Sequence, residues 1–161
     1  MIEVKNVILN LQLPYHIVLT GDLTYKFITQ SGVVYAAYFI DISETFGADH
    51  VYSFSFDAAG KTVNDGRVRH TIVKILSDFF QVNHNSLIVV CETCDKKENA
   101  RFRLFEKWYD QTGKHDIEKV DASVDHADYN FRSSLLLSKE HSCYEEIKSI
   151  YDEWVKSEME K

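Results

Sequence analysis

The sequence predicts one α+β domain, with helices packed on a largely antiparallel sheet. Three observations point to this class. Segments with the alternating pattern of strands stand before, between and after stretches with the apolar spacing of helices. Only one proline and six glycines occur among 161 residues, which favours short loops and regular elements. No linker, repeat or low-complexity segment interrupts the chain, so we expect residues 1–161 to form a single domain.

The first part of the chain carries strand patterns. The apolar stretches 2–13 and 16–20 fit strands, and short helices fit them equally well. Residues 25–29 alternate, and residues 33–41 form a mostly apolar run after the turn residues that end at Gly32. This arrangement predicts a β-hairpin.

A strand, a helix and a buried strand are expected next. Residues 51–56 alternate, with aromatic residues on one face and small or polar residues on the other, as in a half-buried strand. Asn64 is the expected N-cap of a helix. The apolar face of this helix consists of Val68, Ile72, Val73, Ile75, Leu76, Phe79 and Phe80. Residues 87–91 are continuously apolar, which is typical of a central strand buried on both faces.

A second helix and two strands follow. A pattern like a capping box at residues 95–98 introduces a helix over about residues 98–111, and Gly113 ends it. Strands are expected near residues 117–125 and 129–138.

The last element is a helix. Ser142 and Glu145 form its predicted capping box. Its apolar stripe consists of Cys143, Ile147, Ile150, Tyr151 and Trp154. The predicted order is therefore β-β-β-α-β-α-β-β-α. The stretch before residue 25 adds a further element, for which a strand and a short helix both stay open.

Composition excludes several classes of function. Lys and Arg number 18 against 25 Asp and Glu, and the net charge of −7 argues against binding nucleic acid through its phosphates. No apolar run approaches the roughly 20 residues of a membrane-spanning helix, so we expect no membrane contact. Three cysteines, an odd number, fit a reducing compartment, and the N-terminus lacks the features of a secretory signal. A cytoplasmic location is the resulting expectation.

Cys91 and Cys94 form the first candidate site. The pair does not open a helix, as redox-active Cys-x-x-Cys pairs do. A zinc site would need two more ligands, for which His141 and Cys143 are available at an unusual spacing. Buried cysteines acting as small hydrophobic residues are the favoured interpretation, so we expect no metal.

Arg101 is a second candidate because it breaks two local rules. It falls in the middle of the apolar face of the predicted helix 98–111, and in the first turn, where the helix dipole disfavours positive charge. A buried guanidinium needs a carboxylate partner, and Glu92, Asp95 and Asp125 are the candidates. A structural link between helix and sheet is favoured, and the functional alternative is a site for a phosphate or carboxylate at the helix N-terminus.

The acidic strand near residue 121 is a third candidate. Alternation places Asp121, Ser123 and Asp125 on one face, and His126 follows. Such a group of residues could serve as general acid and base or hold a divalent ion, which gives the hypothesis of a metal-dependent hydrolase. The favoured interpretation is the charged outer face of an edge strand.

Three groups of residues carry a resemblance to a known family. They are Tyr25-Lys-Phe27-Ile-Thr29 with Gly32 and Tyr35, then Cys91 to Asp95 leading to Arg101-Phe-Arg103-Leu-Phe105-Glu-Lys-Trp108, and then Tyr129 with Ser134-Leu135-Leu136. In these residues the chain resembles a small family of uncharacterised bacterial proteins, a domain of unknown function. The resemblance implies a bacterial, intracellular setting and brings no activity with it.

The predicted order of elements is also similar to the core of the Gcn5-related N-acetyltransferases. Those enzymes hold the pyrophosphate of acetyl-CoA with the backbone amides of a glycine-rich turn before the first core helix. In the matching stretch here, Gly66 has no second glycine at the required spacing, and Arg67 and Arg69 follow it. No cofactor is therefore expected, with CoA as the alternative.

We expect a non-enzymatic protein that binds a protein partner, or a second copy of itself, through its acidic surface or its aromatic sheet face. No complete catalytic constellation is visible, and an acidic surface favours basic targets. The alternative is a divergent acetyltransferase-like protein that binds CoA or a nucleotide. In that alternative Arg67, Arg69 and Arg101 hold phosphates, and Tyr109 or Cys91 lies near the chemistry.

Overall fold

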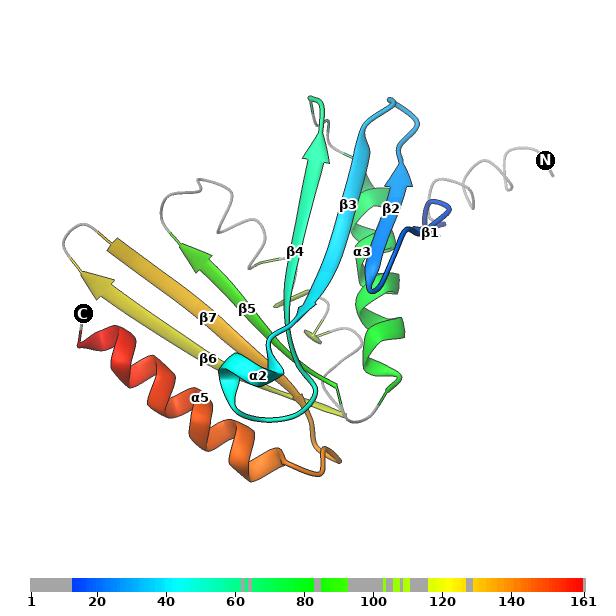
Figure 1. Cartoon of the computed structure of the whole chain (residues 1–161). Helices are drawn as coiled ribbons and strands as arrows, with labels where there is room; N and C mark the ends of the chain where they lie inside the picture. Colours follow the sequence, from blue (N-terminus) through cyan, green and yellow to red (C-terminus); the bar gives the residue numbers. More distant parts are fainter. Residues whose placement is uncertain are drawn as a thin grey trace. The chain divides into compact units, whose positions relative to one another are not determined.

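A computed structural model shows an α+β protein in which seven strands form a mostly antiparallel sheet (Figure 1). It describes residues 13–61, 63, 65–82, 85–92, 103, 106, 107, 109, 110, 116–126 and 129–160. The strands are β1 Val18–Leu19, β2 Thr24–Ile28, β3 Val34–Asp41, β4 Val51–Ala59, β5 Ser86–Glu92, β6 Ile117–His126 and β7 Tyr129–Ser138. The helices are α2 Ser43–Phe46, α3 Gly66–Phe80 and α5 Tyr144–Met159, and the described residues Arg103, Glu106 and Lys107 are also helical. The predicted fold class is confirmed.

The hydrogen-bonded order of the strands is β1-β2-β3-β4-β5-β7-β6. Strands β4 and β5 pair in parallel, whereas β1–β2, β2–β3, β5–β7 and β6–β7 pair in the antiparallel sense. The chain divides into two compact units. The first unit comprises Met1–Phe39 and Ser55–Phe79, and the second comprises Ile40–Phe54 and Phe80–Lys161.

The first unit contains the predicted hairpin of β2 and β3. Phe27 pairs with Tyr35 across the two strands, and the turn closes with a hydrogen bond from the Gly32 N–H to the Thr29 carbonyl, 2.9 Å long. Gly32 has a φ of +85°, a conformation that glycine adopts without a steric penalty. The hairpin aromatics fill the interior, since Phe27, Tyr35 and Phe39 are all buried.

Helix α3 has the apolar face that its sequence predicts. Ile72, Ile75, Leu76 and Phe79 are each less than 5% exposed. The helix begins at Gly66, and the Asp65 carboxylate accepts the Arg67 backbone N–H at 3.0 Å. Asp65 therefore caps the helix in place of the predicted Asn64, which lies outside the described residues.

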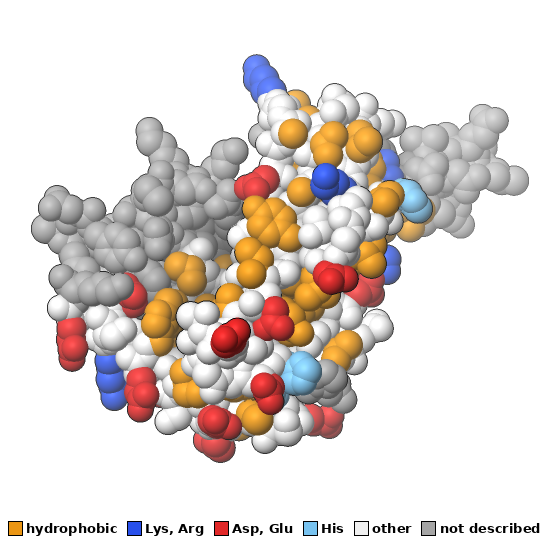
Figure 2. All heavy atoms as spheres, viewed as in Figure 1, with side chains coloured by type: hydrophobic (Ala, Val, Ile, Leu, Met, Phe, Trp, Pro, Cys, Tyr) orange, Lys and Arg blue, Asp and Glu red, His pale blue; other side chains and the backbone are white. Residues whose placement is uncertain are grey.

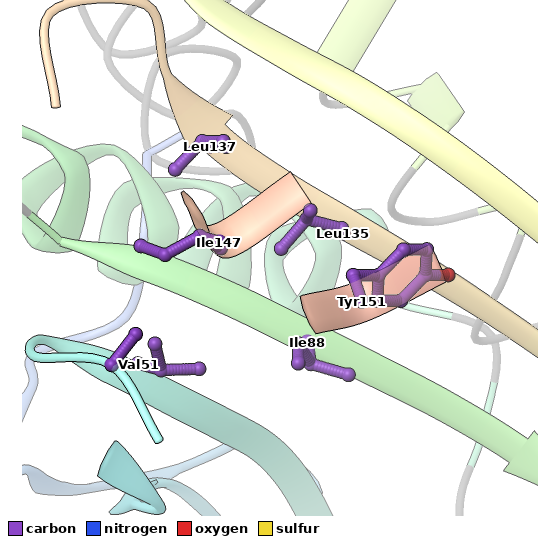
Figure 3. Packing of buried hydrophobic residues seen from close by; sticks show 7 residues of the cluster. Val51, Ile88, Leu135, Leu137, Ile147 and Tyr151 are labelled. Carbon is purple, nitrogen blue, oxygen red and sulfur yellow. The ribbon is translucent and has the colours of Figure 1, made fainter. Parts of the chain in front are cut away.

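The second unit has its core between the sheet and α5. Side chains from β4, β5, β7 and α5 point toward one another there (Figure 3). The cluster consists of Ala48, Val51, Ile88, Leu135, Leu137, Ile147 and Tyr151. The predicted apolar stripe of the last helix is confirmed, because Ile147 and Tyr151 are buried and the other three residues pack against the cluster. Strand β5 is buried on both faces at Leu87, Ile88 and Val89, as its continuous apolar run predicts.

Two local predictions in this unit are wrong, and one short helix was not predicted. Strand β4 does not have one polar face, because Val51 and Phe54 are both buried although they point to opposite faces. Helix α2 was not predicted, since one turn is too short to show a helical period. Ser142 does not cap α5; the helix follows Cys143, whose N–H donates to His141 Nδ1 at 2.9 Å.

The predicted helix over residues 98–111 and the stretch 2–13 lie mostly or wholly outside the described residues. Residues 16–20 contain the short strand β1, in agreement with the strand alternative. No helix of the described residues is both long and apolar enough to cross a membrane.

Candidate functional site

The arginines predicted to hold phosphates lie at the start of α3 in the first unit. The Arg67 guanidinium stands 3.9 Å from the centroid of the Tyr15 ring, and its Nε donates to the Leu13 carbonyl at 2.9 Å. Arg69 is exposed, and Arg101 lies outside the described residues. Arg67 is therefore engaged in holding the segment around Tyr15 against the helix.

Tyr15 is the centre of this contact. Its hydroxyl donates to Asp65 Oδ2 at 2.5 Å and accepts the Gln30 backbone N–H at 3.3 Å. Its own backbone N–H donates to Thr71 Oγ1 at 2.8 Å. Burial and then the hydrogen bond to Asp65 raise the pKa of the Tyr15 hydroxyl. The network is architectural, because its polar groups are paired with one another.

The acidic strand candidates lie on β6 in the second unit. Asp121 accepts hydrogen bonds from Ser134 Oγ at 2.5 Å and from Lys119 Nζ at 2.7 Å. Asp125 is exposed and pairs in register with Asn130. The predicted alternation is confirmed, because Val124 is buried and Val120 and Ala122 pack against the core cluster.

For the remaining predicted site residues the structure gives little more than their positions. Cys91 is the last residue but one of β5 and pairs with Arg132, and His126 ends β6, but the side chains of Cys91 and His126 lie outside the described part of the structure. Tyr109 is partly exposed. Within the described residues no three His, Cys, Asp or Glu side chains are arranged to hold a metal ion. The roles assigned to these residues stay predictions.

The second unit holds a pocket with an acidic lining that the sequence did not reveal. Its volume is about 660 Å³, and four exposed carboxylates from Asp41, Glu44, Asp49 and Glu146 line it. The other lining residues are Ser43, Gly47, Ala48 and Cys143. Because none of its described lining residues is Lys, Arg or His, the pocket favours a positively charged group. We call it the acidic pocket.

Helix α2 is fixed in place beneath this pocket by its first residue. Ser43 Oγ accepts the Val51 N–H at 3.0 Å and lies 3.3 Å from the Val51 carbonyl oxygen. The Ser43 backbone N–H donates to Asp41 Oδ1 at 2.9 Å. Hydrogen bonds from the Ser43 hydroxyl and backbone N–H lower the pKa of Asp41, so this carboxylate stays ionised at neutral pH. Gly47, with a φ of +94°, ends the helix in the left-handed conformation.

A second pocket adjoins the same two helices and is mainly apolar. Its volume is about 490 Å³, within the range of about 300–1,000 Å³ that is usual for ligand sites. It is lined by Ile42, Thr45, Phe46, Ser53, Ile88, Val90, Ile150, Glu153 and Trp154. Ser53 and Ile88 are register partners on β4 and β5, so they share one face of the sheet. Val90 is 41% exposed although it is a large hydrophobic residue. We call this the apolar pocket.

The two pockets are neighbours because α2 and α5 line both of them. Cys143, which precedes α5, and Glu146 of α5 line the acidic pocket, whereas Ile150, Glu153 and Trp154 of α5 line the apolar one. On the face seen in Figure 2, acidic side chains gather over the region of α2 and α5, with hydrophobic side chains between them. The arrangement can hold a ligand that has a cationic part and an apolar part.

Sequence reasoning missed both pockets, although weak signals exist. Residues 41–49 carry three acids, one at the end of a predicted strand and two in the short connection to the next strand, which is unusual for a plain turn. Glu146 and Glu153 flank the predicted apolar stripe of the last helix at a spacing of seven, so they share one helix face. Neither signal reveals that the two segments meet.

Comparisons with known proteins give a family and little else. A family described as "Family of unknown function (DUF6169)" matches residues 64–153, more than half of the chain. A comparison with curated proteins finds no match. Among solved structures, a CoA-dependent acyl-homoserine lactone synthase, MesI, is similar at 10% identity and a TM-score of 0.39, covering 82% of this chain and 70% of that one. Likeness at this level carries no argument about activity.

Proposed function

Because the chain belongs to the family of unknown function DUF6169, which brings no activity with it, we propose a function from the geometry of the second unit. In this proposal the protein is an interaction module that binds a basic segment of a partner protein between α2 and α5. One observation carries it: an acidic pocket and an apolar pocket adjoin, and none of the described residues that line them is lysine or arginine.

The two pockets contribute in different ways. The carboxylates of the acidic pocket are exposed to solvent, so each ion pair with a partner contributes only about 0–1 kcal/mol. Their main effect is to attract basic partners and to exclude acidic ones. The apolar pocket supplies most of the affinity, because a buried hydrophobic side chain contributes about 1.5–3 kcal/mol. The net charge of −7 acts in the same direction as the acidic pocket.

The experiment measures binding of a defined peptide by fluorescence anisotropy. The probe is a labelled peptide that contains lysines and leucines, and a peptide with glutamate in place of lysine is the counterpart. We expect the lysine peptide to bind and the glutamate peptide to fail. Replacing two pocket carboxylates, Glu44→Gln with Glu146→Gln, is expected to weaken binding about fivefold at low salt and less at about 0.15 M salt, where charges are screened.

A matched control separates the pocket from the overall charge. Glu145 and Asp152 are exposed carboxylates on the same helix as Glu146, but they line neither pocket. The double variant Glu145→Gln with Asp152→Asn therefore changes the net charge by the same amount and is expected to leave binding unchanged. If both double variants weaken peptide binding equally, the effect comes from the overall charge of the protein, and the proposal is contradicted.

A CoA or nucleotide site is the alternative from the sequence. It has less support, because within the described part of the chain neither pocket has a basic lining, and Arg67 is engaged with Tyr15 and Leu13. A thermal-shift comparison of CoA, ATP and the lysine peptide distinguishes the two functions, since a ligand that binds the native state raises the melting temperature. Stabilisation by CoA or ATP, with none by the peptide, would replace the proposal.

A further inference from the structure

We propose that residues 13–19 of the first unit are an exchangeable strap, which in a dimer of this protein leaves its own site and binds the same site on a second copy. The strap contains β1 and is joined to β2 by residues 20–23. We call residues 20–23 the hinge. The inference concerns the first unit alone and does not depend on the function proposed for the second.

One side chain anchors the strap. All of the strap is described, and Tyr15 is its only buried residue. Leu13, Val18 and Leu19 are each at least 48% exposed. Strand β1 pairs only two residues with β2. Release of the strap therefore removes one side chain from the interior and breaks one short strand pairing.

The site that holds the strap is built by residues from β2, the β2–β3 turn and the start of α3. The Phe27 ring stacks on the Tyr15 ring, with centroids 6.0 Å apart and an interplanar angle of 10°. The hydrogen bonds of Tyr15 and Leu13 with Gln30, Asp65, Arg67 and Thr71 join residues 15 to 56 positions apart. The hinge supplies none of these groups. The strap of a second copy can therefore make the same contacts.

The hinge is strained when the strap lies on its own unit. Leu23 has a φ of +58°, and Gly21 has a φ of +125°. A bulky residue such as leucine rarely adopts a positive φ, and among the described residues the only other non-glycine residue that does so is His50. When the strap crosses to a second copy, the hinge can extend and Leu23 can leave this conformation. A short hinge under strain favours exchange.

The apolar residues next to the hinge favour a second copy as the partner. Val18 and Leu19 are large, exposed side chains that directly precede the hinge. In an exchanged dimer the two hinges run past each other, so these side chains are covered by the other copy. The site also fits a tyrosine followed three and four positions later by two strand residues, which is the pattern of this chain itself.

The test mixes two variants, each of which lacks one half of the contact. Tyr15→Ala removes the anchor and leaves the site intact, whereas Arg67→Ala with Thr71→Val alters the site and leaves the anchor intact. The two are mixed at about 1 mM, the order of the effective concentration that a short linker gives. They are held in urea just below the unfolding transition and returned to buffer. We expect native mass spectrometry to show a heterodimer at least about tenfold more abundant than either homodimer, because only the heterodimer contains a complete site.

The matched control carries all three substitutions in one chain, which is mixed with the wild type in the same way. The wild type already has a complete site, so we expect no enrichment of the heterodimer. If the two variants form no heterodimer, or if the control forms it equally well, exchange of the strap is overturned.

The hinge gives a second test in which the strap and its site stay intact. Deletion of Gly21 and Asp22 removes about 7 Å of chain, so the strap no longer reaches its own site and we expect a dimer by light scattering. Leu23→Gly relieves the strain and is expected to lower the dimer fraction of the wild type about fivefold, whereas Asp22→Gly is the control and leaves it unchanged. A deletion variant that is monomeric at about 1 mM, or a dimer of it that persists after Tyr15→Ala, overturns the proposal.

Discussion

Removing the hydroxyl of Tyr151 is expected to stabilise the protein. Tyr151 lies on α5 inside the core cluster, 1% exposed, with its ring among Ile88 and Leu135 (Figure 3). Its hydroxyl and the Ser133 hydroxyl are both buried, and neither has a hydrogen-bond partner of ordinary geometry among the described residues. A buried polar group without a partner costs about 1–3 kcal/mol, so Tyr151→Phe should raise the free energy of unfolding by about 1 kcal/mol.

The Tyr151 hydroxyl also makes the free energy of unfolding depend on pH, in a direction that follows from its pKa. Burial raises the pKa of Tyr151 to about 12, although the nearby Ser133 hydroxyl lowers this pKa by a smaller amount. In the unfolded chain a tyrosine has a pKa of about 10. Because the pKa of Tyr151 is higher in the folded state than in the unfolded state, the contribution of Tyr151 to stability is fully present below about pH 10. This contribution declines by about 3 kcal/mol as the pH rises to about 12. Tyr151→Phe removes this contribution to the alkaline decline.

Urea unfolding followed by circular dichroism measures both effects. The wild type and Tyr151→Phe are compared at pH 7 and at steps above pH 9, and their difference isolates Tyr151 from the other buried tyrosines. Tyr144→Phe on the same helix is the contrasting control, because the Tyr144 hydroxyl donates to Glu118 Oε2, and its loss should destabilise by about 1 kcal/mol. A loss of more than about 1 kcal/mol in Tyr151→Phe at pH 7 would show that its hydroxyl is well paired and refute the reasoning.

Three further substitutions probe the fold. Ile147→Ala, at a core position with no exposed surface, is expected to lower the free energy of unfolding by about 2–5 kcal/mol in urea titrations; a loss below about 1 kcal/mol would contradict the packing. Tyr15→Phe removes the hydrogen bonds with Asp65 and Gln30 and should lower the thermal midpoint by several degrees, corresponding to about 1–2 kcal/mol. Gly47→Ala should destabilise by about 1 kcal/mol in the same melts, because the φ of +94° strains alanine even though no atom lies within 4 Å of the added Cβ. An unchanged midpoint would show that the turn relaxes.

The elements with a strong period could be read from the sequence, because one helix or strand face decides their burial. Helix α3 and the stripe of α5 that carries Ile147 and Tyr151 follow their 3.6-residue pattern. The turn at Gly32 was also predictable, since its left-handed backbone needs a residue without a Cβ. In each case the physical cause is local.

The helix caps were not predictable from the sequence, because neighbouring side chains compete for the same backbone groups. Asp65 lies next to Asn64 in the sequence and takes the cap of α3, and its second oxygen also accepts the hydroxyl of Tyr15. At α5 the buried His141 accepts the backbone N–H that a Ser142 cap would leave free. These choices depend on tertiary partners that the local sequence does not contain.

The candidate site could not be predicted from the sequence for a further reason, and the same reason affects how the site binds a ligand. Its two walls, residues 41–49 and 143–154, are about a hundred positions apart, so no local pattern joins them. The first wall is short and would move freely by itself, but the bonds of Ser43 to Val51 tie it to a strand that also supplies the core. The second wall rests on the same core through Ile147 and Tyr151. Because both walls rest on one core, the site loses little conformational entropy when it binds. The entropic cost of binding therefore comes mainly from ordering the partner segment. A partner segment that is held rigid before binding should therefore bind more tightly, without any new contact.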